Sequence, residues 1–309
     1  MSTNKDLPPI GPKSKPIGGD RWAVVLLAHG SQRGADRTEC SCFWQSSDPE
    51  PPNWCPGCPN TPDGLKDAAQ RLQVSLGEDQ AEVILSCLEF IEPHPNQAVQ
   101  IIREQGLKRV VIAPFLLGNG KHATLELDEV LEELQSQEPS LELHLAQGLG
   151  AEFGLADLVA HRIKSLPAAN PIKSDEASPT GIIIVKAGTK TEYDDCLWLE
   201  KLGQMVESEL GPGFAVAVAQ SHYGDPTMEN AAEHLINARG ASRLIAMPYL
   251  FFPGMILKRN VLGEMDRLQE AYPDIPMGIT PPLGMDDRVV KVAEMRVREV
   301  WKRIGLSEQ

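Results

Sequence analysis

Residues 110–122, VVIAPFLLGNGKH, decide the fold of this chain, because residues 244–256, LIAMPYLFFPGMI, repeat them. In both copies a short apolar run meets a proline, and a glycine follows in the loop beyond. This pattern is typical of a buried strand of a parallel sheet that ends in a loop. The first copy ends in His122 and the second in Ile256, and this difference is the first indication of where the function lies.

The repetition extends over most of the chain. From Pro114 to Gly150 a constant offset of 134 residues aligns the two halves, so that Gly150 falls opposite Gly284. Upstream of that stretch, His29 falls opposite Ala187 and Glu89 opposite His222. We interpret this as a tandem duplication of one α/β unit.

Hydrophobic periodicity predicts alternating strands and helices in each half. In the first half we expect strands at 22–28, 81–88, the start of 110–122 and 141–146, each followed by a helix, at about 63–76, 96–105, 124–135 and 152–165. In the second half we expect strands at 182–185, 214–219, the start of 244–256 and 276–280, with helices at 193–210, 227–238, from about 257, and 286–303. This alternation predicts the α/β class, with two tandem flavodoxin-like or chelatase-like units, each a four-stranded parallel sheet flanked by helices.

The expected domain limits follow from the same pattern. Residues 1–19 form a Pro-rich tail, 20–165 a first unit that carries the active site, 166–180 a linker with three prolines, and 181–305 a degenerate second unit. The first unit contains a Cys-rich insert at about 35–60, which the second lacks.

Bulk properties exclude several classes of protein. A formal net charge of −14 argues against a nucleic-acid partner, which would need a basic face. No apolar run approaches the roughly 20 residues of a membrane-spanning helix, and the N-terminal stretch lacks the apolar segment of a signal peptide. We therefore expect a cytoplasmic protein without membrane contact.

Three chemically active side chains follow three different strands of the first half, namely His29, Glu89 and His122. Because ligands of open parallel sheets bind beyond the carboxyl ends of the strands, these residues are expected at one edge. Two imidazoles and a carboxylate suit a borderline metal ion, and the same groups accept protons near neutral pH. Each residue singly is equally consistent with an ordinary hydrogen-bonded loop side chain.

A family resemblance rests on three motifs: AHGS at 28–31, LEFIEP at 88–93 and PFLLGNGKH at 114–122. In order and placement they resemble the signatures of the class II tetrapyrrole chelatases, the CbiX and SirB type, in its long two-unit form. The resemblance covers nearly the whole chain apart from the tail and the cysteine insert. It implies that His29 and His122 are the active-site histidines and Glu89 the accompanying acid. The second half departs from the pattern at Ala187, His222 and Ile256, so it is expected to form a wall of the cleft.

The resemblance implies a sirohydrochlorin chelatase, a lyase that inserts a divalent ion without a nucleotide or an organic cofactor. Co²⁺ insertion for cobalamin synthesis is favoured because long forms resemble cobaltochelatases, and Fe²⁺ insertion for sirohaem is the alternative. The imidazoles would hold the ion, while Glu89 with a histidine accepts the pyrrole protons. The alternative to an enzyme is a binding protein that carries the tetrapyrrole or the metal ion without turnover. The role of His222 stays open.

Sirohydrochlorin carries eight carboxylates, which the net negative charge of the chain would repel. We expect Ser31 among the substrate-binding residues, and a local positive rim of side chains in loops after strands: Arg33, Lys121, Lys186, Lys190, Lys258 and Arg259. The alternative is an ordinary solvated surface.

Four of the six cysteines crowd one segment, as Cys40 and Cys42 followed by Cys55 and Cys58. Two closely spaced pairs separated by a dozen residues predict a four-thiolate site. Structural zinc is the simplest occupant, an iron–sulfur cluster is the alternative, and disulfides are a third choice in a reducing compartment. Cys87 and Cys196 stand alone and are expected to be small core or near-core residues.

Overall fold

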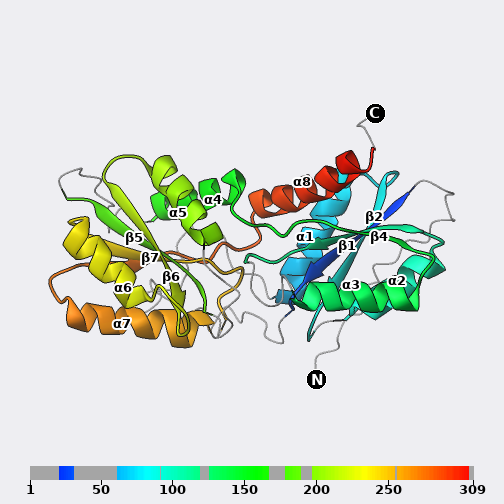
Figure 1. Cartoon of the computed structure of the whole chain (residues 1–309). Helices are drawn as coiled ribbons and strands as arrows, with labels where there is room; N and C mark the ends of the chain where they lie inside the picture. Colours follow the sequence, from blue (N-terminus) through cyan, green and yellow to red (C-terminus); the bar gives the residue numbers. More distant parts are fainter. Residues whose placement is uncertain are drawn as a thin grey trace, which may run out of the picture.

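A computed structural model of the chain describes residues 21–30, 61–90, 92–118, 125–166, 178–188, 197–254 and 256–305 (Figure 1). The expected tail (1–19), the cysteine insert (about 35–60) and most of the expected linker (166–180) lie outside these ranges. No helix within the described ranges is long and apolar enough to cross a membrane.

The first half forms a four-stranded parallel sheet in the order β2-β1-β3-β4. Its elements are β1 (Trp22–Ala28), α1 (Thr61–Leu76), β2 (Ala81–Cys87), α2 (Pro95–Glu104), β3 (Arg109–Pro114), α3 (Leu125–Gln137), β4 (Glu142–Leu145) and α4 (Phe153–Lys164). Every residue of β1 is buried, as the apolar run in the sequence indicates for a central parallel strand.

The second half repeats this topology as β6-β5-β7-β8. Its elements are β5 (Thr180–Ala187), α5 (Leu197–Leu210), β6 (Phe214–Ser221), α6 (Met228–Glu233), η4 (His234–Ala238), β7 (Arg243–Pro248), η5 (Ile256–Val261), α7 (Leu262–Ala271), β8 (Met277–Ile279) and α8 (Asp287–Arg303). The predicted fold class, two four-stranded parallel sheets flanked by helices, is confirmed.

Two expected helices change geometry along their length. The helix expected at 227–238 begins as α6, with Thr227 accepting a hydrogen bond from the Asn230 amide, and continues as the π-helix η4. The helix expected from about 257 begins as the π-helix η5 and continues as α7. Periodicity in sequence does not distinguish these wider turns from α-helix.

Strand registers define which residues are equivalent in the two halves. Trp22 pairs with Ala81 and Arg109, just as Thr180 pairs with Phe214 and Arg243. Counting along the chain from these anchors places His29 opposite Ala187 and Glu89 opposite His222. The alignment read from the repeat is therefore also the alignment in space.

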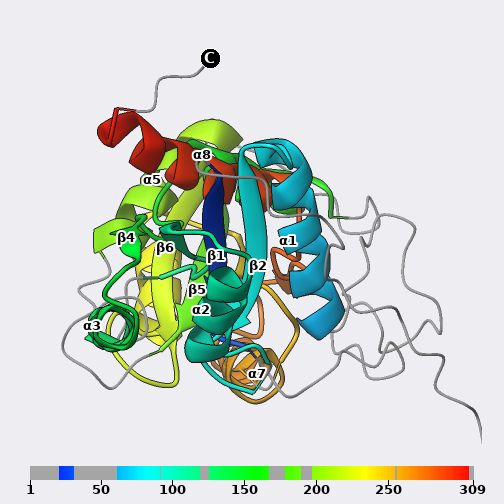
Figure 2. The ribbon, with the colours of Figure 1, turned by 90° about the vertical axis from the view of Figure 1, so that its right-hand side faces the viewer.

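The outer faces of the two sheets are covered by helices of their own half (Figures 1 and 2). In the first half α2 and α3 pack there through side chains such as Ile102 and Leu134. In the second half α6, η5 and α7 do the same through Met228, Leu257 and Leu268. Each outer core thus belongs to one half alone.

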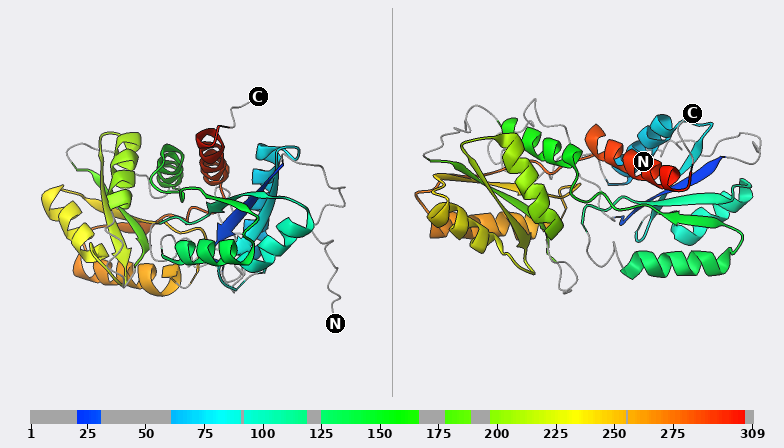
Figure 3. Two further views of the ribbon diagram at one scale, coloured as in Figure 1. Left: turned by 45° about the vertical axis from the view of Figure 1, so that its right-hand side comes forward. Right: turned by 45° about the horizontal axis from the view of Figure 1, so that its top comes forward.

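The inner faces of the two sheets share one core. The last helix of each half packs against the other half. Helix α4, the last element of the first half, packs on α5, and α8, the last of the second, packs on α1 and β3. The two exchanged helices also contact each other and lie side by side between the sheets (Figure 3). A single apolar cluster therefore includes Val24 of β1, Ile184 of β5 and Trp301 of α8, and it joins the two sheets.

Candidate functional site

His29 and Glu89 lie just beyond the ends of the neighbouring strands β1 and β2, and their backbones are hydrogen-bonded to each other. The Glu89 amide donates to the His29 carbonyl oxygen at 2.9 Å, directly after the Leu88 amide donates to that of Ala28. These bonds continue the β1–β2 ladder past the end of both strands. His29 is half-buried and Glu89 is exposed, so Glu89 is the more open to solvent of the two.

Glycine at position 30 allows the two strand ends to approach each other. Gly30 has φ +89°, and a Cβ atom there would collide with the Glu89 carbonyl oxygen. The Cys87 Cβ also lies 3.2 Å from that position. The glycine of the HGS motif is thus required by backbone proximity as well as by conformation.

The tautomer of His29 follows from its neighbour. Nδ1 lies 3.1 Å from the Gly30 carbonyl oxygen, which only accepts hydrogen bonds. In the neutral ring the proton therefore sits on Nδ1, and Nε2 carries the lone pair that a metal ion or a proton would take. A backbone carbonyl on the other ring nitrogen is the usual arrangement of metal-binding histidines.

The turn after β2 has a counterpart in the second half. The Glu92–Pro93 and Asp225–Pro226 peptide bonds are both cis. The Pro93 carbonyl accepts from the Cys87 amide, and the Pro226 carbonyl accepts from the Gln220 amide. Glu89 and His222 thus occupy equivalent positions after β2 and β6, but the turns differ there, because φ is positive at Phe90 in the first half and at His222 in the second.

The end of β3 faces the second half. Phe115 is buried, its amide donates to Leu27, and its ring stacks on that of Phe251 at 5.0 Å. A Cβ added at Gly118 would lie 3.0 Å from the Trp198 ring. The strand ends of the first sheet therefore approach those of the second across a shared boundary.

Several residues predicted for the site lie outside the described residues: Ser31, Arg33, Lys121, His122, Lys190 and Cys40, Cys42, Cys55 and Cys58. Of the expected set His29, Glu89 and His122, the structure thus places two, and it brings those two together. In the described ranges, which omit His122, no three His, Cys, Asp or Glu side chains are grouped closely enough to hold a metal ion.

Equivalent positions in the second half carry different chemistry. Ala187 has no ligating side chain, and Ile256, which begins η5, is exposed. His222 is exposed, its amide donates to Glu264 at 2.8 Å, and its ring contacts that of Tyr223 edge-on at 4.0 Å.

The expected positive rim needs one correction. Lys186 lies within β5, not in a loop after it, and its buried ammonium donates to the Ala187 carbonyl at 3.1 Å. It is therefore a strand residue rather than part of a surface rim. Lys258 is half-buried and Arg259 exposed in η5, which follows β7.

Sequence reasoning missed two buried arginines, Arg162 in α4 and Arg296 in α8. Their side chains are only 9% exposed, and each donates to at least one carbonyl oxygen of the opposite half. Both interrupt the apolar face of a helix, at positions 134 residues apart. A charged residue that recurs at equivalent apolar positions of both halves is the sequence signal that could have identified them.

A cavity of about 780 Å³ lies away from the strand ends, beside the edge strand β6. Its lining includes Glu207, which accepts from the Val216 amide and pairs with Arg239. The carboxylate thus occupies an edge amide of the sheet, as Gln73 does for Val83 in the first half. We assign Glu207 to protection of the sheet edge, because it pairs with the Val216 amide and with Arg239.

Comparison with known proteins gives a consistent picture. The family model described as CbiX matches residues 59–166 and 181–300. A sirohydrochlorin ferrochelatase of Priestia megaterium is 23% identical over 183 residues, which are 59% of this chain and 64% of that relative. A sirohydrochlorin cobaltochelatase of Saccharolobus islandicus is 29% identical over 87 residues, 26% of this chain and 67% of that relative.

The fold also resembles a solved structure. SirB from Bacillus subtilis with Fe³⁺ superposes with a TM-score of 0.67 at 18% identity, covering 94% of this chain and 100% of that one. At this identity the likeness establishes a shared fold.

Proposed function

Because this chain belongs to the CbiX family, we propose that it catalyses the insertion of a divalent metal ion into sirohydrochlorin. The observation that carries the proposal is the pairing of His29 with Glu89 beyond two adjacent strands, at the position of the family motifs. The relatives named as ferrochelatase and cobaltochelatase support the same class of reaction.

Metal insertion makes two demands on the protein. The ion must exchange water for macrocycle nitrogens, and the two inner N–H groups must release their protons. His29 offers Nε2 as a ligand because Nδ1 faces the Gly30 carbonyl. We assign the second imidazole to His122, and proton acceptance to Glu89 together with a histidine. The exposed carboxylate of Glu89 has the solvent access through which the protons can leave.

The identity of the ion is a separate proposal. Imidazole and carboxylate ligands accept Co²⁺ and Fe²⁺ alike, so the donor set alone does not choose. We favour Co²⁺ because long two-unit chains resemble cobaltochelatases, and we keep Fe²⁺ as the alternative. Parallel kinetics with Co²⁺, Fe²⁺ and Ni²⁺ at equal free concentration decides between them.

The proposal is tested by following the absorbance of sirohydrochlorin with Co²⁺ or Fe²⁺, with and without the protein. We expect acceleration by the wild type, and a loss of about 10²-fold or more in kcat for His29→Ala and His122→Ala. His222→Ala is the control, because it removes an exposed imidazole of the second half, at the position equivalent to Glu89 and not to either histidine. No acceleration by folded wild type, with tight sirohydrochlorin binding, would instead favour the carrier.

The roles of the two halves follow from the substitutions between them. We propose that residues 20–165 carry the reacting groups and 181–305 form the opposing wall, since Ala187 and Ile256 replace both histidines. Helices α4 and α8 cross between these sequence units, so the wall and the reacting half are held by a common core.

The cysteine insert adds a further proposal. Cys40, Cys42, Cys55 and Cys58 supply four thiolates, the donor set of a structural zinc ion or of an iron–sulfur cluster. We favour zinc, in a protein that we place in the cytoplasm. Elemental analysis of the purified protein tests this, and absence of zinc, iron and brown colour would exclude both.

A further inference from the structure

Two arginines occupy equivalent positions on the exchanged helices. Arg162 lies on α4 and Arg296 on α8, separated by the same 134 residues that relate the two halves. Both are buried, and each forms hydrogen bonds with the loop after the last strand of the half that its helix has joined. The two contacts are equivalent: Arg162 of the first half binds the second half, and Arg296 of the second half binds the first.

Arg296 binds the loop that follows β4. Its Nε donates to the Gly148 carbonyl at 3.1 Å, and Nη2 donates to the Leu149 carbonyl at 3.4 Å and to the Glu152 carboxylate at 2.5 Å. Nη1 donates to Glu299 on its own helix. The guanidinium thus ties both carbonyls and the N-terminus of α4 together from across the boundary between the halves.

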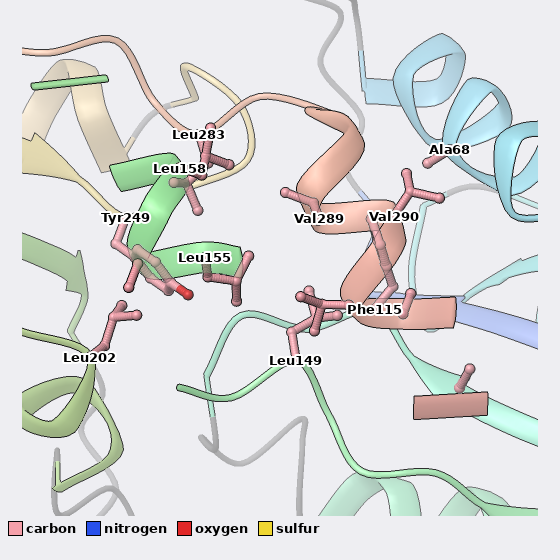
Figure 4. Packing of buried hydrophobic residues seen from close by; sticks show 14 of the residues in the cluster. Ala68, Phe115, Leu149, Leu155, Leu158, Leu202, Tyr249, Leu283, Val289 and Val290 are labelled. Carbon is pink, nitrogen blue, oxygen red and sulfur yellow. The ribbon is translucent and has the colours of Figure 1, made fainter. Parts of the chain in front are cut away.

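The same loop supports the end of β3. The Leu149 amide donates to the Leu116 carbonyl at 3.3 Å, and the Leu149 side chain is fully buried. Figure 4 shows Leu149 beside Phe115 in the core between the two sheets. Leu116 lies two residues beyond β3, in the segment whose sequence continues to His122.

Arg162 makes the corresponding contact in the second half. Its Nη2 donates to the Leu283 carbonyl at 2.9 Å and lies 3.5 Å from Asp286. The Leu283 amide in turn donates to the Leu250 carbonyl. The segment after Leu250 leads to Ile256, where the second half has no histidine.

We propose that Arg296 is a positioning residue for the reaction of the first half, acting through Leu149 on Leu116. The second unit then contributes more than a wall, because its last helix holds the backbone from which the His122 segment departs. Arg162 has the same chemistry but supports a segment without a reacting group. This inference rests on the proposed metal insertion.

The test compares Arg296→Met with Arg162→Met. Both changes leave buried carbonyl oxygens unpaired and are expected to lower Tm by similar amounts. Arg296→Met should lower kcat by about 10-fold or more, because a shift of about 1 Å in a reacting group can cost roughly 10²-fold. Arg162→Met should leave kcat unchanged, as should Glu299→Ala, which removes the acceptor of the contact within α8 and no contact with the loop after β4. Equal kcat in Arg296→Met and Arg162→Met would overturn the proposal.

Hydrogen exchange separates this inference from the proposed function. Exchange of the Leu149 amide should accelerate in Arg296→Met and not in Arg162→Met, with the reverse for the Leu283 amide. This readout needs no turnover, so a wild type without chelatase activity would refute the proposed function and leave the structural link measurable. Unchanged Leu149 exchange would refute the link. If Arg296→Met does not fold, Arg296→Lys carries the same test, since it keeps the charge near Glu152 and loses the Nε donor.

Discussion

Phe115 and Phe251 stack face to face across the boundary between the two halves, with ring centroids 5.0 Å apart and planes inclined by 9°. Phe115 follows β3 and is fully buried, whereas Phe251 follows β7 and is half-buried. The stack therefore connects the strand ends of the first half with those of the second.

The stack should contribute measurably to stability. Phe115→Ala is expected to lower the free energy of unfolding by about 3–5 kcal/mol, because it opens a cavity in the shared core. Phe251→Ala should cost less, since that ring is partly exposed. A double-mutant cycle followed by urea unfolding should give a coupling of about 0.5–1.5 kcal/mol. Strictly additive effects would mean that the two rings do not interact.

Gly30→Ala should damage both stability and activity. The new Cβ would meet the Glu89 carbonyl oxygen at a residue with φ +89°, and backbone cannot move aside like a flexible side chain. We expect a loss of at least about 1–3 kcal/mol, with a fall in kcat as His29 and Glu89 separate. Gly263→Ala in α7 is the control, because nothing lies within 4 Å of the added methyl group, and it should stabilise slightly. Equal thermal melts for the two variants would contradict the close approach.

Acid should weaken the contact between α8 and α1 through Glu294. Burial alone would raise the pKa of this carboxyl, but hydrogen bonds from Lys291, Ser75 and Arg298 outweigh it and hold the pKa below its usual range. The ionised form is thus favoured by folding, and its stabilisation is present above the ordinary glutamate pKa of about 4.3 and lost as pH falls through the lower folded value.

Comparison of wild type with Glu294→Gln checks this linkage. The difference in the free energy of unfolding should be largest near pH 6, at about 1–3 kcal/mol, and should shrink as the pH falls below about 4. Glu270→Gln, at an exposed position, is the control for the removal of a surface carboxylate. A difference that grows in acid would reverse the assigned direction of the shift.

Cys87 should be chemically inert in the folded protein. It is 1% exposed, and burial raises the pKa of its thiol to about 11. Iodoacetamide reacts with the thiolate, so at pH 8 peptide mass mapping should find Cys87 unmodified in the native protein and alkylated in guanidinium. Rapid native labelling at this position would show that the strand end opens.

The residues left to form a positive rim can be tested by charge removal. Replacing Lys121 and Lys258 together by Met should raise KM for sirohydrochlorin with little change in kcat, since these groups are proposed to hold its carboxylates. Lys302→Met, which removes an exposed charge of α8, is the matched control. An unchanged KM in the double variant would leave Lys121 and Lys258 as ordinary surface charges.

Local patterns were sufficient to predict the two sheets. A run such as that of β1 buries both faces, so its composition indicates a central parallel strand, and the repeat at 110–122 and 244–256 indicates two copies. The prediction failed at Lys186 because a charged side chain suggests a loop. In the structure its ammonium donates to the Ala187 carbonyl and the strand continues to Ala187.

The pairing of His29 with Glu89 was predictable only as a shared edge. Parallel strands must place their carboxyl ends together, but the direct contact depends on Gly30, whose backbone lies against that of Glu89. The contact forms because β1 and β2 are neighbours in the sheet. The order of strands along the chain does not by itself give their order in the sheet.

The sequence by itself determined the duplicated α/β units, the placement of His29 and Glu89 just beyond strand ends, and the replacement of His29 and His122 by Ala187 and Ile256 in the second half. Only the tertiary structure decided that α4 and α8 exchange partners and that Arg162 and Arg296 bind opposite halves. The physical reason is that the two helices are equivalent copies with similar apolar faces, so either sheet satisfies their pattern. Which sheet each helix covers depends on the packing of the whole inner core.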